Sequence, residues 1–253
     1  MIIDLNGLNI LLTGSSRGIG FGIARALLEN KARVALHYNK NRTNLERLLK
    51  EKSGYKGELF QANLEDLRET EKLFKNVTNK FGKIDILINN AGIAIDSPIL
   101  KETEGWLEDW EKTLRVNLSS LALLCKLAIE HFLKIGGGRI INIASRAAFR
   151  GDTPDYMAYA ASKGGIVSLT RTIARGFGKK NVKAFLIAPG FVRTDMARDF
   201  TDKYGEGIAL DDIALNKLTT PDDIAPFVVF LSSGLADHAT GGTFDINAGS
   251  YVH

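Results

Sequence analysis

The stretch that decides the fold is Thr13-Gly14-Ser15-Ser16-Arg17-Gly18-Ile19-Gly20, which joins the apolar run Asn9–Thr13 to a helically spaced segment, Ile19–Asn30. This pattern predicts a strand, a tight turn and a helix. Glycines let the backbone approach a pyrophosphate, whose charge a helix N-terminus favours. The spacing is GxxxGxG and not the more common GxGxxG. A plain strand-to-helix connection is the alternative, and the position on the first strand of a βαβ unit favours the phosphate-binding interpretation.

Short aliphatic runs alternate with helical segments over the rest of the chain. The predicted strands are Asn9–Thr13, Arg33–His37, Glu58–Gln61, Ile84–Ile88, Arg139–Ala144, Val182–Ile187 and Thr243–Ile246. The predicted helices include Ile19–Asn30, Leu64–Phe81, Leu107–Leu133, Ala158–Phe177 and one that starts at Pro221. Alternation of this kind predicts an α/β fold with right-handed crossovers. We expect one domain over residues 1–253, a Rossmann-type, doubly wound, parallel seven-stranded sheet with helices on both faces.

One segment breaks the alternation. Phe191–Leu218 is rich in charges and glycine without a clear strand, and long irregular segments in compact domains are usually functional. We therefore expect a substrate flap at about residues 191–218. It contains apolar side chains suited to an acyl chain and polar ones suited to hydroxyl groups. The apolar ones are Phe191, Met196, Phe200 and Tyr204, and the polar ones are Asp195, Arg198, Asp199 and Asp202.

Composition excludes several classes of protein. With 45% hydrophobic and 25% charged residues among 253, the chain is neither mainly disordered, nor collagen-like, nor a coiled coil. The net charge of +4 is small and dispersed, which argues against nucleic-acid binding. A single cysteine, Cys125, and four histidines predict no internal disulfide, no metal site and a reducing, cytoplasmic location. No stretch reaches the roughly 18 uninterrupted apolar residues of a membrane span, so we expect no membrane anchor.

The end of the second predicted strand indicates which dinucleotide binds. It reads His37-Tyr38-Asn39-Lys40-Asn41-Arg42, with no acid to grip a ribose 2′-hydroxyl before Glu46. Lys40 and Arg42, with Arg17 from the turn, suit a 2′-phosphate. The sequence therefore predicts NADP(H) in preference to NAD(H).

Tyr159 and Lys163 are the strongest candidates for acid–base chemistry. Four residues apart on a predicted helix, they lie on one face. An ammonium beside a phenol favours phenolate, so we expect Lys163 to lower the tyrosine pKa and make Tyr159 a proton donor to a carbonyl oxygen. Tyr156 is excluded, because the residue four positions on is Ala160.

Polar residues at other strand ends point to the same place. Ser145 ends the fifth strand, Asn89-Asn90-Ala91-Gly92 ends the fourth, and Pro189-Gly190 leads from the sixth to Thr194. Ligands of doubly wound sheets bind at the carboxyl ends of strands. We therefore expect these residues, and Asn117 from the following helix, to meet in one crevice.

These motifs together resemble the short-chain dehydrogenase/reductase family over nearly the whole chain. The resemblance implies that Tyr159 is the general acid/base and that Lys163 lowers its pKa and holds the nicotinamide ribose. Ser145 would bind the substrate oxygen, and Asn117 would maintain a proton-relay water. Thr194 would hold the carboxamide, while Asn63 replaces the usual aspartate at the adenine. The expected cofactor-binding residues are Gly14, Ser16, Arg17, Gly18, Ile19, Gly20, Tyr38, Asn39, Lys40, Arg42, Asn63, Leu64, Asn90, Ala91, Gly92, Tyr159, Lys163, Pro189, Gly190, Val192 and Thr194.

The pattern is most similar to 3-oxoacyl-(acyl-carrier-protein) reductases, which implies a carbonyl substrate and a homotetramer or homodimer. Of the two basic positions that such enzymes carry for their acidic carrier, Lys179-Lys180 fills one and Gly136-Gly137-Gly138 stands at the other. A glucose-type sugar dehydrogenase and a general ketone reductase are the alternatives for the substrate. A sensor or scaffold that binds NADP(H) without turnover is the alternative of another class, and an interaction module without nucleotide is the least favoured.

Overall fold

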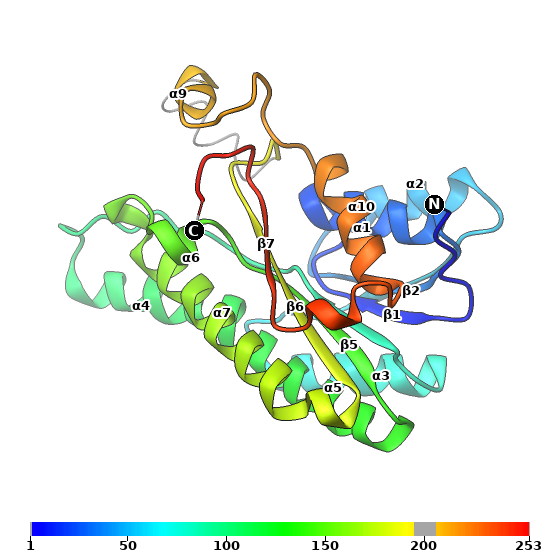
Figure 1. The fold of residues 1–253 in the computed structure, drawn as a ribbon. Coiled ribbons are helices and arrows are strands. Elements are labelled where there is room, and N and C mark those ends of the chain that lie inside the picture. Colours follow the sequence, from blue (N-terminus) through cyan, green and yellow to red (C-terminus); the bar gives the residue numbers. More distant parts are fainter. Residues whose placement is uncertain (1, 195–205, 253) are drawn as a thin grey trace.

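The computed structural model describes residues 2–194 and 206–252 (Figure 1). Within these residues seven parallel strands form one sheet, in the order β3-β2-β1-β4-β5-β6-β7. The strands are β1 (Asn9–Leu12), β2 (Arg33–Tyr38), β3 (Lys56–Gln61), β4 (Ile86–Asn89), β5 (Gly138–Ile143), β6 (Val182–Pro189) and β7 (Thr243–Ile246). The order reverses between β1 and β4, which places a crevice at their carboxyl ends. The predicted Rossmann-type parallel sheet is confirmed.

Helices cover both faces of this sheet. The α-helices are α1 (Gly18–Glu29), α2 (Thr43–Glu51), α3 (Leu67–Phe81), α4 (Thr103–Leu114), α5 (Ser120–Ile135), α6 (Ala147–Arg150), α7 (Met157–Phe177), α9 (Glu206–Asp211) and α10 (Pro221–Ser232). Short 3-10 turns are η2 (Pro154–Tyr156), η3 (Gly178–Lys180) and η4 (Asp237–Ala239), and η1 (Arg115–Ser119) is a π-helical turn. One apolar core packs α3, α5 and α7 on one face, and a second packs α1, α2 and α10 on the other (Figure 1).

The element boundaries differ from the predicted ones where polar residues intervene. The helix expected from Leu64 begins only at Leu67, because the Asp66 carboxylate accepts a 2.7 Å hydrogen bond from the Arg68 amide and caps it. Strand β3 begins at Lys56 and not at Glu58, because its pairing with β2 and not its apolar content fixes the start. Backbone pairing of this kind leaves no mark in hydrophobic periodicity.

The helix expected over Leu107–Leu133 is a composite of α4, η1 and α5. Residues 103–135 are long enough to cross a membrane and contain an 18-residue window of mean hydropathy 1.4. Core packing accounts for this composition, because Leu124, Ala128 and Phe132 are at most 1% exposed against the sheet.

Cys125 lies inside that core on α5. Its thiol contacts the side chains of Asn89 and Asn142, which are themselves joined by a 2.9 Å hydrogen bond. Burial raises the pKa of Cys125 to about 12, although the two asparagines oppose the shift. The thiol therefore stays protonated and unreactive at neutral pH.

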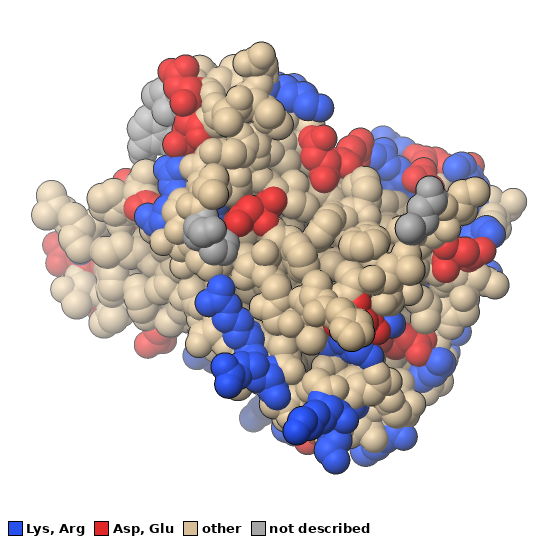
Figure 2. All heavy atoms as spheres, viewed as in Figure 1, with Lys and Arg blue, Asp and Glu red and all other residues tan. Residues whose placement is uncertain are grey.

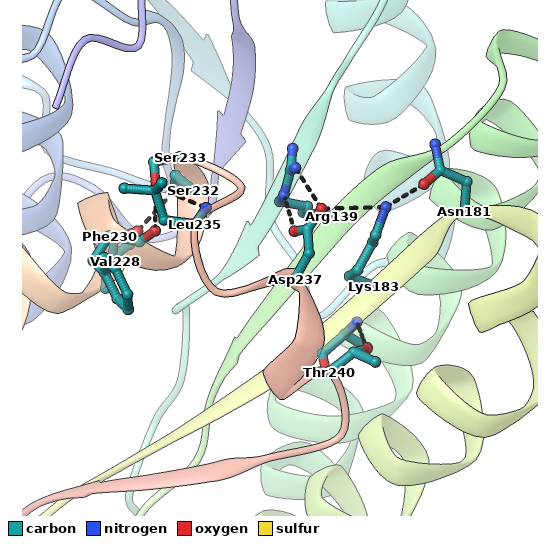
Figure 3. A network of polar contacts seen from close by, with 11 residues as sticks. Arg139, Asn181, Lys183, Val228, Phe230, Ser232, Ser233, Leu235, Asp237 and Thr240 are labelled. Atoms are coloured by element: carbon teal, nitrogen blue, oxygen red, sulfur yellow. Dashed lines mark hydrogen bonds and ion pairs between the residues drawn. The ribbon is translucent and has the colours of Figure 1, made fainter.

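A polar clamp formed by Arg139, Lys183 and Asp237 lies at the amino ends of β5 and β6, at the other end of the strands from the crevice (Figure 3). Arg139 donates two hydrogen bonds, of 2.7 and 2.8 Å, to the Asp237 carboxylate at the start of η4. Lys183 lies 3.3 Å from the same carboxylate and also bonds Asn181. The clamp thus joins two strands to the segment that precedes β7.

Candidate active site

A cleft of about 450 Å³ opens where β1, β2, β4 and β5 end. Sixteen residues expected at a dinucleotide site line it. They are Gly14, Ser16, Arg17, Gly18, Ile19, Gly20, Asn39, Lys40, Asn63, Leu64, Asn90, Ala91, Gly92, Tyr159, Lys163 and Thr194. The other expected residues, which do not line it, are Tyr38, Arg42, Asn117, Ser145, Pro189, Gly190 and Val192.

The glycine-rich turn is fixed to the end of β4. The amides of Asn90 and Ala91 donate to Thr13 Oγ1 at 3.0 and 3.1 Å, and Asn90 Nδ2 donates to the carbonyl oxygens of Thr13 and Gly14. Gly14 has a φ of +65°, and a Cβ there would lie 2.8 Å from Ala91 Cα. A Cβ at Gly20 would overlap the Gly14 carbonyl oxygen. Glycine is therefore required by close packing at both positions.

The start of α1 suits an anionic group. Among its described neighbours no side chain caps the helix, and its first turn carries no acid. The unpaired amides of a first helical turn bind phosphate readily. The described cleft lining has the cations Arg17, Lys40, Lys112 and Lys163 against one acid, Glu65. The residues present thus fit a dinucleotide, with its phosphates against Gly18–Gly20.

The three cations expected at a 2′-phosphate do not all face the cleft. Arg17 and Lys40 line it, whereas the Arg42 guanidinium lies 2.9 Å from the Glu46 carboxylate. Tyr38 and Glu46 together raise the pKa of Arg42. Arg42, which directly precedes α2, is therefore paired with the acid four residues on.

The part of the cleft expected to hold an adenine is formed where β3 ends. Asn63 Oδ1 accepts a 3.1 Å hydrogen bond from the Glu65 backbone amide, and the Asn63 backbone amide donates to the Glu69 carboxylate at 2.6 Å. An amide oxygen has two lone pairs, so Asn63 retains the capacity to accept from an adenine amino group.

The candidate catalytic residues meet where β5 and α7 approach each other. Lys163 Nζ donates a 3.0 Å hydrogen bond to the Ile143 carbonyl oxygen, which anchors the ammonium to the last residue of β5. The Ser145 hydroxyl, two residues further on, accepts from the Ala147 amide at 3.1 Å and lowers the pKa of the Tyr159 phenol. Ser145 is thus held by α6 with its hydroxyl at the phenol.

The pKa values correct one sequence expectation. Burial raises the pKa of Tyr159 to about 12, the Ser145 hydroxyl lowers it, and the Asp152 carboxylate raises it further. The expected lowering by Lys163 is wrong for this arrangement, because burial also lowers the pKa of Lys163 to about 8 and its ammonium bonds Ile143. Tyr159 is therefore protonated at neutral pH, as a proton donor must be.

Asn117 supports this centre from the π-helical turn η1. Its Oδ1 accepts from the Ile93 amide at 2.8 Å, and its Nδ2 donates to the Ile93 carbonyl and to Ser162 Oγ at 2.8 and 3.1 Å. Both amide hydrogens are therefore used, so a bound water could contact this side chain only by donating to Oδ1. Turns of this kind are frequent at functional sites.

The chain from β6 reaches the cleft at Thr194. Pro189 accepts from the Arg146 amide, Gly190 donates to Ile246, and Val192 pairs with Thr219. Thr194 lines the cleft beside Gly18, whose Cβ would lie 3.2 Å from Thr194 Cγ2. Pro189, Gly190 and Val192 thus set the path of the chain.

The segment expected as a flap is anchored at its described end. Met196, Phe200, Tyr204, Asp195, Arg198, Asp199 and Asp202 lie outside the described residues. Asp212 pairs with Arg146 at 2.5 Å and with Arg150 at 3.0 Å. Ala214 donates to the Ala248 carbonyl at 2.8 Å. Because Arg146 follows Ser145 directly, this anchor joins the segment to the element that carries the serine.

Seven residues of the cleft were not expected from the sequence. They are His37, Glu65, Ile93, Lys112, Val116, Ile143 and Ala144. A polar residue inside an apolar strand was the available signal for His37. Lys112 has no such signal, because it differs from other helical lysines only in where α4 places it.

Comparison with known proteins supports the geometry. Residues 14–251 match a family model described as enoyl-(acyl carrier protein) reductase. The chain is 34% identical over 251 residues to a 3-oxoacyl-(acyl-carrier-protein) reductase of Chlamydia pneumoniae, covering 98% of this chain and 99% of the relative. It is 35% identical to a Synechocystis 3-oxoacyl-(acyl-carrier-protein) reductase, covering 94% and 95%. A solved Agrobacterium tumefaciens chain, provisionally described as a gluconate dehydrogenase, superposes with a TM-score of 0.90 at 27% identity and full coverage of both chains.

Proposed function

Since the chain belongs to the short-chain dehydrogenase/reductase family, and is thus an oxidoreductase that acts on CH–OH or C=O groups with a nicotinamide cofactor, we propose that it is an NADP(H)-dependent 3-oxoacyl thioester reductase. The observation that carries the proposal is the placing of the Ser145 hydroxyl where it acts on the Tyr159 phenol, with the ammonium of Lys163 over the tyrosine ring. Two hydroxyl donors that converge on one point suit a carbonyl oxygen.

The residues divide the work of such a reaction. When bound, the nicotinamide supplies a hydride to the carbonyl carbon or accepts one from the alcohol. Tyr159 donates its phenolic proton to the carbonyl oxygen, which avoids a free alkoxide. Ser145 hydrogen-bonds the same oxygen and keeps the carbonyl oriented. Lys163 would hold the nicotinamide ribose through its ammonium.

Further residues would hold the rest of the cofactor. Thr194 suits the carboxamide, Asn90 to Gly92 suit the adenosine side, and Arg17 and Lys40 suit a 2′-phosphate. The cations that face the cleft, and the absence of an acid among the described residues 37–45, support NADP(H) over NAD(H).

Substrate choice falls to the segment at about 191–218, which we propose as a flap within one domain over residues 1–253. Its apolar residues suit an acyl chain, and the two relatives above are named as 3-oxoacyl-(acyl-carrier-protein) reductases. Figure 2 shows Lys and Arg gathered over the C-terminal half of α7 and over η3, where Arg171, Arg175, Lys179 and Lys180 are exposed. An acidic carrier is complementary to such a surface.

Initial rates with acetoacetyl-coenzyme A, crotonyl-coenzyme A and glucose, each with both cofactors in the matching redox state, test the proposal. The 3-oxoacyl thioester with NADPH should give the highest kcat/KM. Faster turnover of glucose would favour a sugar dehydrogenase, a function that resemblance to the provisional gluconate dehydrogenase supports. Turnover of crotonyl-coenzyme A alone would indicate an enoyl reductase. NADPH binding without turnover of any carbonyl would indicate a sensor or scaffold.

We also propose a homotetramer in the cytoplasm, from the family resemblance. Light scattering at micromolar protein should give about four times the chain mass of 27.7 kDa. A monomeric mass would contradict the assembly and leave the proposed reaction untouched.

A further inference from the structure

His37 lies at the base of the cleft with its ring held on both sides. It is the fifth residue of β2 and is 2% exposed. The Gly14 amide donates to Nδ1 at 3.0 Å, and Nε2 lies 3.1 Å from the Ala62 carbonyl oxygen. A backbone amide only donates and a carbonyl only accepts. The ring is therefore neutral, with its proton on Nε2, and burial lowers its pKa to about 4 in agreement.

These contacts tie together two segments that line the cleft. Gly14 belongs to the glycine-rich turn, and Ala62 directly precedes Asn63 and Leu64 at the adenine end. The His37 carbonyl oxygen also accepts from the amide and the hydroxyl of Ser15, both at 2.9 Å. One residue thus holds the turn through its backbone and its side chain, and holds the end of β3 through the same ring.

The contact with Gly14 also fixes the direction of a peptide group. Its amide points to His37, while the carbonyl of the same residue accepts from Asn90 Nδ2 at 2.9 Å. If the imidazole were removed, the Gly14 amide would be left without its protein partner at a part-buried position. An amide that water reaches only partly is costly to leave unpaired, and the turn would move to satisfy it.

We propose that His37 is a positioning residue for the cofactor, which sets the glycine-rich turn against the segment of residues 62–64 so that both meet the dinucleotide. The proposal rests on the proposed function, because it assumes that NADPH binds this cleft. A buried histidine that only stabilises the core would predict a lower melting temperature and no change in cofactor affinity.

Three substitutions separate the two contacts. In His37→Leu neither contact remains. In His37→Asn the amide oxygen takes the δ position of Nδ1 and can accept from Gly14, and in His37→Gln the amide nitrogen takes the ε position of Nε2 and can donate to Ala62. Val34→Ala is the matched control, since Val34 lies on the same strand, is fully buried and packs into the α1 and α10 core.

Isothermal titration with NADPH, thermal melting and the ¹⁵N shifts of the imidazoles test the proposal. We expect Kd to rise about tenfold in His37→Leu, the loss that an unpaired, part-buried amide implies, and to remain within about twofold of wild type in His37→Asn and Val34→Ala. The carbonyl substrate's KM at saturating NADPH should stay constant. The wild-type ring should show the Nε2–H tautomer at neutral pH.

Other outcomes would overturn the proposal. Equal losses of melting temperature in His37→Leu and Val34→Ala with unchanged Kd would make His37 a core residue only. If His37→Leu does not fold, a wild-type Kd in His37→Gln with a weakened one in His37→Asn would refute the role of Gly14. If wild-type protein binds neither NADPH nor NADH, the proposed function fails and this inference fails with it. The two results described before this one would refute the inference alone and leave the proposed function standing.

Discussion

The Lys163 Nζ lies over the Tyr159 ring, 5.5 Å from its centroid. A cation over the face of a phenol stabilises the pair without taking the phenolic proton. The Ser145 hydroxyl lowers the pKa of the same phenol, so Tyr159 remains the proton donor while Ser145 acts at its hydroxyl and Lys163 at the face of its ring. This division leads directly to the first two predictions.

Tyr159→Phe should lower kcat by about 10²- to 10⁴-fold, because it removes the only atom of this side chain that can donate a proton. NADPH Kd should be within about twofold of wild type, since the ring remains. Tyr156→Phe, three residues away in η2, is the matched control and should retain its rate. Steady-state rates with titrated Kd values check both, and near wild-type turnover in Tyr159→Phe would refute the assignment.

The fall of kcat/KM for carbonyl reduction at alkaline pH should reflect deprotonation of Lys163. Burial lowers its pKa to about 8, so the ammonium is present below that pH and is lost as pH rises through it. Tyr159, with a pKa raised to about 12, stays protonated over the same range. We expect kcat/KM to fall above pH 8 in wild type. In Lys163→Arg it should be lower but flat from pH 7 to 10, because a guanidinium keeps its charge. An unchanged alkaline fall in that variant would assign the titration elsewhere.

Lys40 and Arg17 should determine cofactor preference more than Arg42. Each of the first two faces the cleft, so its replacement by alanine should raise KM for NADPH roughly tenfold and leave that for NADH unchanged, as expected for a charge-assisted hydrogen bond to phosphate. Arg42→Ala should change it less, because Glu46 and Tyr38 already hold the guanidinium. Lys50→Ala, exposed on α2, is the control. Equal effects of all three cations would contradict the geometry.

Asp212→Asn should loosen the flap. It weakens the pairs with Arg146 and Arg150, so KM for the carbonyl substrate should rise roughly fivefold while NADPH Kd stays constant. Asp211→Asn, its exposed neighbour, should behave like wild type. An effect of Asp212→Asn on NADPH Kd alone would place its contribution at the cofactor and not at the substrate.

Asp237→Asn should lower the free energy of unfolding by about 1–3 kcal/mol, since it leaves Arg139 and Lys183 with an impaired partner (Figure 3). Burial opposes ionisation of Asp237, but Arg139 and Lys183 outweigh it and lower its pKa. Asp222→Asn is the control, because its pair with Arg25 is exposed and such pairs contribute little. Urea unfolding of both variants measures the difference. A similar loss of unfolding free energy in each would show that the clamp contributes no more than an exposed ion pair.

The fold was largely predictable because each strand is a local apolar run. All seven runs overlap their strands to within two residues at each end, and the largest differences are at the starts of β3 and β4 and at the end of β6. The edge strand β3 carries Lys56 and Gly57 at its start, which periodicity cannot assign to a strand. No sequence pattern predicts the π-helical turn around Asn117 either, because it adds one residue to a turn without interrupting the helix.

The candidate site was predictable where function imposes spacing along the chain. Tyr159 and Lys163 lie four residues apart, and the glycine turn is contiguous. The direction of the Tyr159 pKa was not predictable, because it depends on burial that packing of distant segments creates. The role of His37 was missed for the same reason, since Gly14 and Ala62 lie 23 and 25 residues away in sequence.

The buried thiol of Cys125 makes this chain convenient for site-specific labelling. It is 1% exposed and has a pKa of about 12, so maleimides and iodoacetamides should not react with it in the folded protein. A fluorophore or spin label could then be attached at one introduced surface cysteine without first removing the natural one. A label on α9, read against a second on α10, would report how residues 206–211 respond to cofactor and substrate in solution.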